Sequence, residues 1–162
     1  MNVHDLLKHN VTFSHGITKA YLADISDEEM LVRAVPGSNH LAWQLGHLIA
    51  SERSLMTSVG GTMPDLPEGF AEKHGKENIA SDDPNDFLSK DEYFQLMGQM
   101  HEAAMAVIDG VDEAGLDAPG PEQMRDFFPT VGSVLFMAGG HEMMHAGQIA
   151  AIRRKLGKPI VM

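Results

Sequence analysis

The 162-residue chain contains no cysteine, which removes three kinds of site from consideration. Without thiols it has no disulfide scaffold, no thiolate zinc site and no cysteine nucleophile. Basic residues are also scarce, since 12 Lys and Arg stand against 23 Asp and Glu, for a formal net charge of −11. A chain this acidic is poorly suited to neutralise phosphate, so we expect neither a nucleic-acid partner nor binding to an anionic membrane surface.

Long apolar runs are missing as well. The longest strongly apolar run covers residues 134–138 and is far shorter than the stretch of about 20 residues that spans a bilayer. Residues 1–16 include histidine, aspartate and lysine, where a signal peptide needs an unbroken apolar stretch, so we expect a cytoplasmic protein. Aromatic residues make up only 6 %, whereas methionine is abundant at 12 residues, and this composition favours helical packing over a β-sandwich.

Apolar residues at three- and four-residue spacing predict four helices, and no segment shows the two-residue alternation of a strand. The helices are expected near residues 3–24, 39–60, 89–110 and 130–156. In the first, Leu6, Asn10, Phe13, Ile17 and Tyr21 would share one face. The sequence therefore predicts an all-α fold, with residues 1–162 as a single domain.

Capping residues mark the ends of these helices. Ser38 or Asn39 is expected to cap the second helix, and Thr130 the fourth. The third begins at Ser89, where Glu92 completes a capping box three residues later. Gly157 is the expected stop of the fourth helix.

The connection between the second and third predicted helices is unusually long. Residues 62–88 include three prolines, and the stretch 65–91 holds eight acids and three bases, so we expect a solvated surface loop. Antiparallel neighbouring helices need only short loops, whereas a connection of this length suits a crossover between parallel helices.

Three of the nine histidines form a candidate metal site. His141 and His145 are four residues apart on the fourth predicted helix, so their rings lie on one face and can reach one ion. Hydrogen bonds or bound water are the alternative for such a buried pair. His47, near the middle of the second helix, lies at the level needed for a third ligand, and His101 is its one rival. Three imidazoles leave an open coordination position, as catalytic rather than structural sites do.

Two better-known metal motifs overlap these residues, and neither fits. The segment 141–145 reads H-E-x-x-H, a zinc-protease pattern with Glu142 as base, but no acidic ligand follows it and the metzincin extension is absent. Glu142 with His145 also matches half of a di-iron bundle, yet no second such pair exists in the chain. We therefore discount a protease and reject a di-iron carboxylate centre.

Two longer segments resemble the motifs of the DinB/YfiT-like proteins. The stretch 41–50, LAWQLGHLIA, resembles their second-helix motif, and the stretch 140–148, GHEMMHAGQ, resembles their final-helix H-x-x-x-H-x-x-Q motif. The order, the separation and the long middle linker also fit. The resemblance implies a four-helix bundle with up-down-down-up topology, a homodimer, and one divalent ion per chain, nickel or zinc, held by His47, His141 and His145.

Relatives of this kind include S-transferases that use bacillithiol or glutathione, so the leading hypothesis is a metalloenzyme that activates a low-molecular-weight thiol for transfer to a small-molecule substrate. A metal-dependent hydrolase with bound hydroxide and a non-catalytic, metal-binding dimer remain alternatives.

Four further residues are candidate pocket or supporting residues. We expect Trp43 and Gln44 to line a pocket near His47, with packing of the tryptophan in the core as the alternative. For Glu142 three roles stay open: contact with a ligand histidine, a dimer contact, or an ordinary surface position. Gln148 lies one turn beyond His145 and is expected to hold a water or a ligand histidine. The remaining histidines are expected on the surface or in ordinary hydrogen bonds: His4, His9, His15, His40 and His74.

Overall fold

Four long helices carry the fold: α1 (Val3–Leu22), α2 (Leu41–Ser58), α4 (Lys90–Gly110) and α6 (Val131–Lys155). A computed structural model describes residues 1–160. Two short helices, α3 (Phe70–Lys73) and α5 (Glu113–Leu116), lie in the connections, with 3-10 turns at Glu28–Leu31, Lys76–Asn78, Pro84–Asp86 and Glu122–Met124. Within the described residues the only strand-like pairing is one bridge between Pro119 and Thr130, so the all-α prediction is confirmed. In the same range, no helix combines the length and apolarity needed to cross a membrane.

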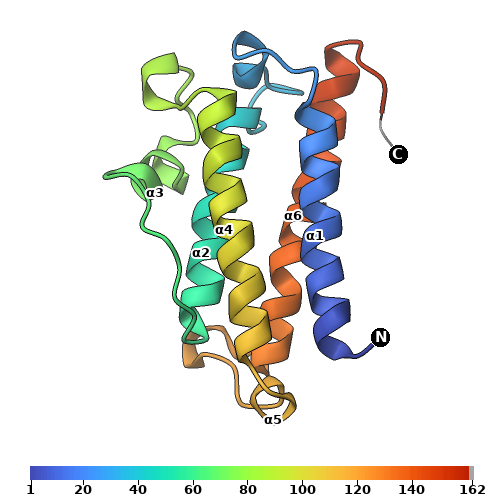
Figure 1. The fold of residues 1–162 in the computed structure, drawn as a ribbon. Helices are drawn as coiled ribbons and strands as arrows, with labels where there is room; N and C mark the ends of the chain where they lie inside the picture. Colours follow the sequence, from blue (N-terminus) through green and yellow to red (C-terminus); the bar gives the residue numbers. More distant parts are fainter. Residues whose placement is uncertain (161–162) are drawn as a thin grey trace.

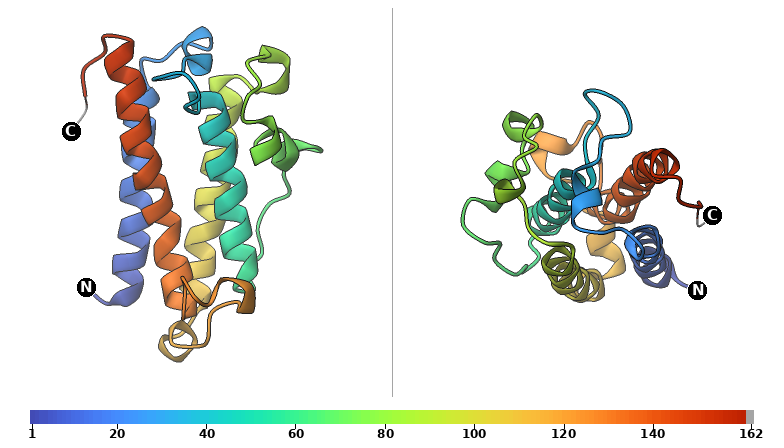
Figure 2. Two further views of the ribbon diagram at one scale, coloured as in Figure 1. Left: turned by 180° about the vertical axis from the view of Figure 1, so that it is seen from behind. Right: turned by 90° about the horizontal axis from the view of Figure 1, so that it is seen from above.

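The four long helices run up, down, down and up, as expected (Figure 1). Around the bundle axis α1 packs on α6, α6 on α2, α2 on α4, and α4 on α1. The green connection that follows α2 climbs the outside of the bundle before α4 begins (Figures 1 and 2). This crossover lets α2 and α4 run parallel as neighbours.

Most of the predicted helix ends are confirmed. Ser89 and Glu92 form the capping box of α4, Thr130 caps α6 through the Ser133 amide, and Gly157 has the positive φ of a helix stop. The prediction for α2 was wrong, because its N-cap is His40, whose Nδ1 accepts the Trp43 amide at 3.1 Å. A histidine nitrogen can thus take the place of the usual Ser or Asn oxygen.

The predicted inward face of α1 was partly wrong. Leu6 and Phe13 are 48 % and 45 % exposed, whereas Leu7 and Val11 are buried. The helix is therefore turned by about one residue from the expected orientation.

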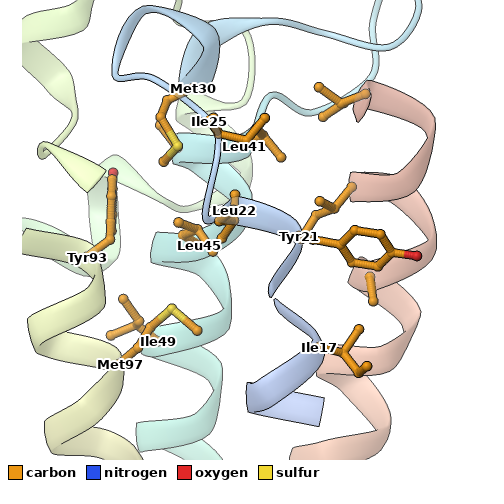
Figure 3. Close-up of a cluster of buried hydrophobic side chains, with 14 of the residues drawn as sticks. Ile17, Tyr21, Leu22, Ile25, Met30, Leu41, Leu45, Ile49, Tyr93 and Met97 are labelled. Carbon is orange, nitrogen blue, oxygen red and sulfur yellow. The ribbon is translucent and has the colours of Figure 1, made fainter. Parts of the chain in front are cut away.

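Two apolar clusters fill the bundle, one toward each end. The larger one joins α1, α2, α4 and α6 through residues such as Leu22, Leu45 and Tyr93 (Figure 3). The smaller one joins the other ends of the same helices through residues such as Val11, Met56 and Leu135. Four titratable side chains, one from each long helix, occur in the sequence between the two sets, and we call them the middle layer: His15, Glu52, His101 and Glu142.

The long connection is less solvated than expected. Phe70 and His74 are 3 % and 2 % exposed, and His74 Nε2 lies 2.7 Å from the Tyr93 hydroxyl. A Cβ at Gly46 would lie 1.9 Å from the His74 ring, so this glycine lets the connection pack directly on α2. The folded connection therefore covers α2 at Gly46, immediately before His47.

Candidate metal centre

Three histidines from two helices converge in the groove between α2 and α6. His47 comes from α2, and His141 and His145 come from successive turns of α6. Their ring centroids are 4.9 to 5.4 Å apart, and one nitrogen from each ring lies within 4.8 Å of the other two. Among the described residues, no other group of three His, Asp or Glu side chains converges in this way.

Gln44 fixes the orientation of His145. The Gln44 amide donates to the Asn39 carbonyl at 2.9 Å, and because that oxygen can only accept, Oε1 of Gln44 must face the other way. Oε1 lies 3.0 Å from Nδ1 of His145, which therefore carries the proton and donates. The Nε2 lone pair of His145 is then free to bind an ion.

Trp43 supports His47 from one turn earlier on α2. Its indole lies parallel to the His47 ring, with 4.8 Å between centroids and 10° between planes. The indole N–H donates to the Gly75 carbonyl at 3.1 Å, so the folded connection holds the tryptophan in place. The ring of His47 is thereby restricted on one side by a fixed aromatic surface.

The environment keeps all three imidazoles neutral. Burial, together with the neighbouring His141 and His47 rings, lowers the pKa of His145 to about 4. Burial also lowers the pKa of His47, with Lys76 adding to the effect. The pKa of His141 is lowered by burial and then by His47. Neutral imidazole is the form that binds metals, so no proton has to leave before an ion binds near pH 7.

The geometry and chemistry of the cluster fit a divalent ion. Metal–imidazole bonds of about 2.0–2.1 Å place the nitrogens of a tetrahedral site about 3.3 Å apart. The observed nitrogens lie within 4.8 Å of one another, so binding one ion would require the three rings to move closer together. No charged acid or thiol joins the described cluster, and imidazole alone suits zinc, nickel, copper and iron.

Glu142 lies inside the bundle, not on its surface. The residue is 8 % exposed, and its Oε2 accepts a hydrogen bond from the Ser14 hydroxyl of α1 at 3.0 Å. Oε1 has no hydrogen-bond partner among the described residues. Burial raises the pKa of Glu142 to about 7, although the hydroxyls of Thr18 and Ser14 oppose the shift. The alternative that Glu142 is an ordinary surface residue is therefore wrong. Within residues 1–160, no hydrogen bond joins Glu142 to the three histidines.

Glu52 is a second interior acid, and on α2 it shares a helical stripe with leucines. It lines a narrow cavity together with His15, His141 and Glu142. Burial raises the pKa of Glu52 to about 8, and the neighbouring Glu142 adds to the shift. An acid at a position with helical spacing to Leu45 and Leu48 was the available signal, because such a stripe faces the core.

His101 does not compete for the ion. It stacks on His15 at 4.7 Å between centroids, and its buried Nδ1 has no hydrogen-bond partner among the described residues. Gln148 is exposed, and Gln44 makes the contact with a ligand histidine that Gln148 was expected to make. Ordinary hydrogen bonds hold three other histidines, as expected: His4, His40 and His74.

Comparisons with known proteins identify a matching family and a solved structure with a similar fold. A family model described as the DinB superfamily matches residues 12–149. A crystal structure of a conserved protein from Enterococcus faecalis is similar, with a TM-score of 0.72 and 16 % sequence identity, over 98 % of this chain and 99 % of the other. A search of curated proteins finds no match.

Proposed function

Given that the chain belongs to the DinB superfamily, we propose that it is a divalent-metal-dependent enzyme in which His47, His141 and His145 hold one nickel or zinc ion. The convergence of one nitrogen from each ring within 4.8 Å carries the proposal. Three neutral nitrogen ligands leave at least one coordination position for a substrate. Residues 1–162 would act as one domain.

The proposed reaction is transfer of a low-molecular-weight thiol to a small electrophile. A divalent ion at this site would lower the pKa of a bound thiol, so that a thiolate is present at neutral pH. The thiolate sulfur would form a bond to the acceptor carbon, and the leaving group would depart with its electron pair. The protein has no cysteine of its own, so the sulfur comes from the cosubstrate. Because such thiols are kept reduced in the cytoplasm, the proposal includes a cytoplasmic location.

Cobalt substitution tests the thiol proposal directly. Addition of glutathione or cysteine to the cobalt-loaded protein should produce a thiolate-to-cobalt absorption band in the near ultraviolet. S-methyl-glutathione, which offers no thiolate, should not produce it. A cobalt spectrum that no thiol perturbs would contradict thiol transfer and would leave metal-assisted hydrolysis as the alternative.

The hydrolytic alternative is favoured by one observation. His141 lines a pocket that opens to solvent, so water has access to the proposed ion. This alternative predicts turnover of simple esters without added thiol, at a rate that rises with pH as bound water ionises. A strict requirement for thiol would exclude it, and inactivity with both substrate classes would favour a non-catalytic, metal-binding module.

The proposal includes a homodimer, because α1 and α6 expose apolar side chains on neighbouring helices. Leu6, Phe13, Phe136 and Met144 are 45–64 % exposed, and Asn10 of α1 donates to the Phe136 carbonyl. Phe136→Glu should convert a dimer to a monomer in analytical ultracentrifugation. Phe127→Glu, on an 84 % exposed residue of the connection before α6, is the matched control. A monomeric wild-type protein at tens of micromolar would contradict the dimer.

A further inference from the structure

A groove lies beside His141, lined by side chains of α2, α6 and the connection before α6. Ser51 and Ser54 form its edge on α2, Met137 lies on α6 one turn before His141, and Leu55 and Phe128 complete the lining. The volume is about 240 Å³, somewhat below the range of about 300–1,000 Å³ for drug-sized ligands, so the groove suits a small group. His141 therefore belongs both to the proposed metal centre and to the wall of this groove.

The groove is amphipathic and carries no ionic charge. Its α2 edge offers two hydroxyl groups, and the opposite side offers a thioether and an aromatic ring. Arg53, the only basic residue near the two serines in sequence, is turned away because its guanidinium donates to the Pro64 carbonyl and to Asp65. An ionised group placed here would lose part of its hydration and would meet no opposite charge among the lining side chains, so the lining favours an uncharged group.

Phe128 lines the groove from a well-anchored connection. Its amide donates to the Met124 carbonyl at 2.8 Å, and the Gly120 amide donates to Pro129 at 2.9 Å. A Cβ at Gly120 would lie 2.1 Å from the Phe128 carbonyl oxygen, so glycine permits this close approach. An aromatic ring held by an ordered backbone is suited to binding, because little conformational freedom is lost when a ligand packs on it.

We propose that this groove binds the uncharged, apolar part of the substrate, an aromatic or branched aliphatic group whose reactive end lies beside His141. The location of the reactive end rests on the proposed function. The chemical class of the bound group rests on the residues that line the groove. Ser51 and Ser54 would accept or donate hydrogen bonds at one edge of that group. The substrate would then be a neutral, amphipathic electrophile, not a sugar phosphate or a dicarboxylate.

A pair of ligands with the same metal-binding head separates this subsite from the metal site. Imidazole and 4-phenylimidazole can be titrated into cobalt-loaded protein while the visible cobalt bands are followed. We expect 4-phenylimidazole to bind about tenfold more tightly, because its ring is removed from water in the groove. 4-(4-Carboxyphenyl)imidazole, whose carboxylate is too far away to reach the same ion, should lose this gain in affinity.

Neighbouring phenylalanines provide matched variants. Phe128→Ala should reduce the phenylimidazole-to-imidazole affinity ratio to about threefold, whereas Phe127→Ala should leave it unchanged. Because each ratio is taken within one variant, altered metal affinity does not affect it. A ratio near one in the wild type, or an unchanged ratio in Phe128→Ala, would overturn the subsite and leave the metal centre standing.

A measurement without metal keeps the two proposals apart. Benzyl alcohol added to metal-free protein should shift the amide NMR signals of Ser51, Ser54 and Phe128, and these shifts should be lost in Phe128→Ala. If imidazole does not perturb the cobalt spectrum but these shifts occur, the open metal site fails and the apolar groove stands. Absence of the shifts in the wild type would overturn the groove as a binding site.

Discussion

Two groups of polar side chains interrupt the apolar interior, and their surroundings differ. In the three-histidine cluster, Gln44 contacts His145 and Trp43 stacks on His47, so the rings are oriented by their neighbours. In the middle layer, the Oε1 atom of Glu142 and the Nδ1 atom of His101 have no hydrogen-bond partner among the described residues. The three histidines are arranged around a common point, whereas the middle layer leaves some of its buried polar atoms without hydrogen bonds.

The difference shows how burial acts on acids and bases in one bundle. Burial favours the neutral form in both groups, because it lowers the pKa of His145 and raises the pKa of Glu52. A neutral imidazole keeps a lone pair that a cation can use, whereas a neutral carboxyl group has lost the charge that would attract one. An unsatisfied buried polar atom costs about 1–3 kcal/mol, so the middle layer lowers the stability of the fold.

The largest expected effect breaks the three-histidine cluster. His47→Ala should lower zinc or nickel affinity by at least about a hundredfold, because two imidazoles from one helix cannot close the site. His101→Ala removes a histidine from the middle layer and should leave the metal content unchanged. Elemental analysis of untagged protein, with circular dichroism to confirm folding, measures both. Full occupancy in His47→Ala, or its loss in His101→Ala, would show that the ligands are assigned wrongly.

Local sequence patterns predicted the parts of the site that lie on one helix. The four-residue spacing places His141 and His145 on the same face of α6 wherever that helix packs. His47 was expected to join them because it lies near the middle of its helix, as His141 does, and the three rings do converge. The helix limits and the caps at Ser89 and Thr130 are also local properties. The up-down-down-up topology came from the length of one connection and from the family resemblance.

The contacts between helices could not be predicted in the same way. Which glutamine meets His145 depends on how far α2 is rotated against α6, and that rotation brings Gln44 into contact while Gln148 stays exposed. The middle layer depends on the relative heights of all four helices. The burial of His74 depends on a glycine in another element, Gly46. Each of these is set by packing between distant segments, which helical periodicity does not encode.

A middle-layer variant should change the pH dependence of stability. Because the folded pKa of Glu52 is about 8 and the ordinary value is 4.5, the unfolded chain ionises at lower pH than the folded one. The contribution of Glu52 to the free energy of unfolding is therefore fully present below pH 4.5 and is lost as the pH rises toward 8. Glu52→Gln cannot ionise, so at pH 8 it should raise the free energy of unfolding by about 2 kcal/mol, a value reduced for partial exposure.

Urea unfolding at two pH values provides the measurement. The stabilisation of Glu52→Gln should be present at pH 8 and absent at pH 5. Glu68→Gln, which alters an exposed carboxylate, should follow the wild type at both. Equal destabilisation of Glu52→Gln at both pH values would mean that the carboxylate makes a specific interaction that its amide cannot replace.

The smallest expected effect tests whether orientation by neighbours distinguishes the three-histidine cluster. Gln44→Leu removes the acceptor of the His145 Nδ1 proton, so the ring can adopt the other tautomer or turn away, and metal affinity should fall about tenfold. Gln44→Glu keeps an acceptor at that position and should restore most of the affinity, which a purely steric role for Gln44 would not predict. Gln148→Leu is the matched control on the exposed side of α6 and should bind metal as the wild type does. Equal affinities for Gln44→Leu and the wild type, measured by competition with a chelator, would show that the backbone alone orients His145.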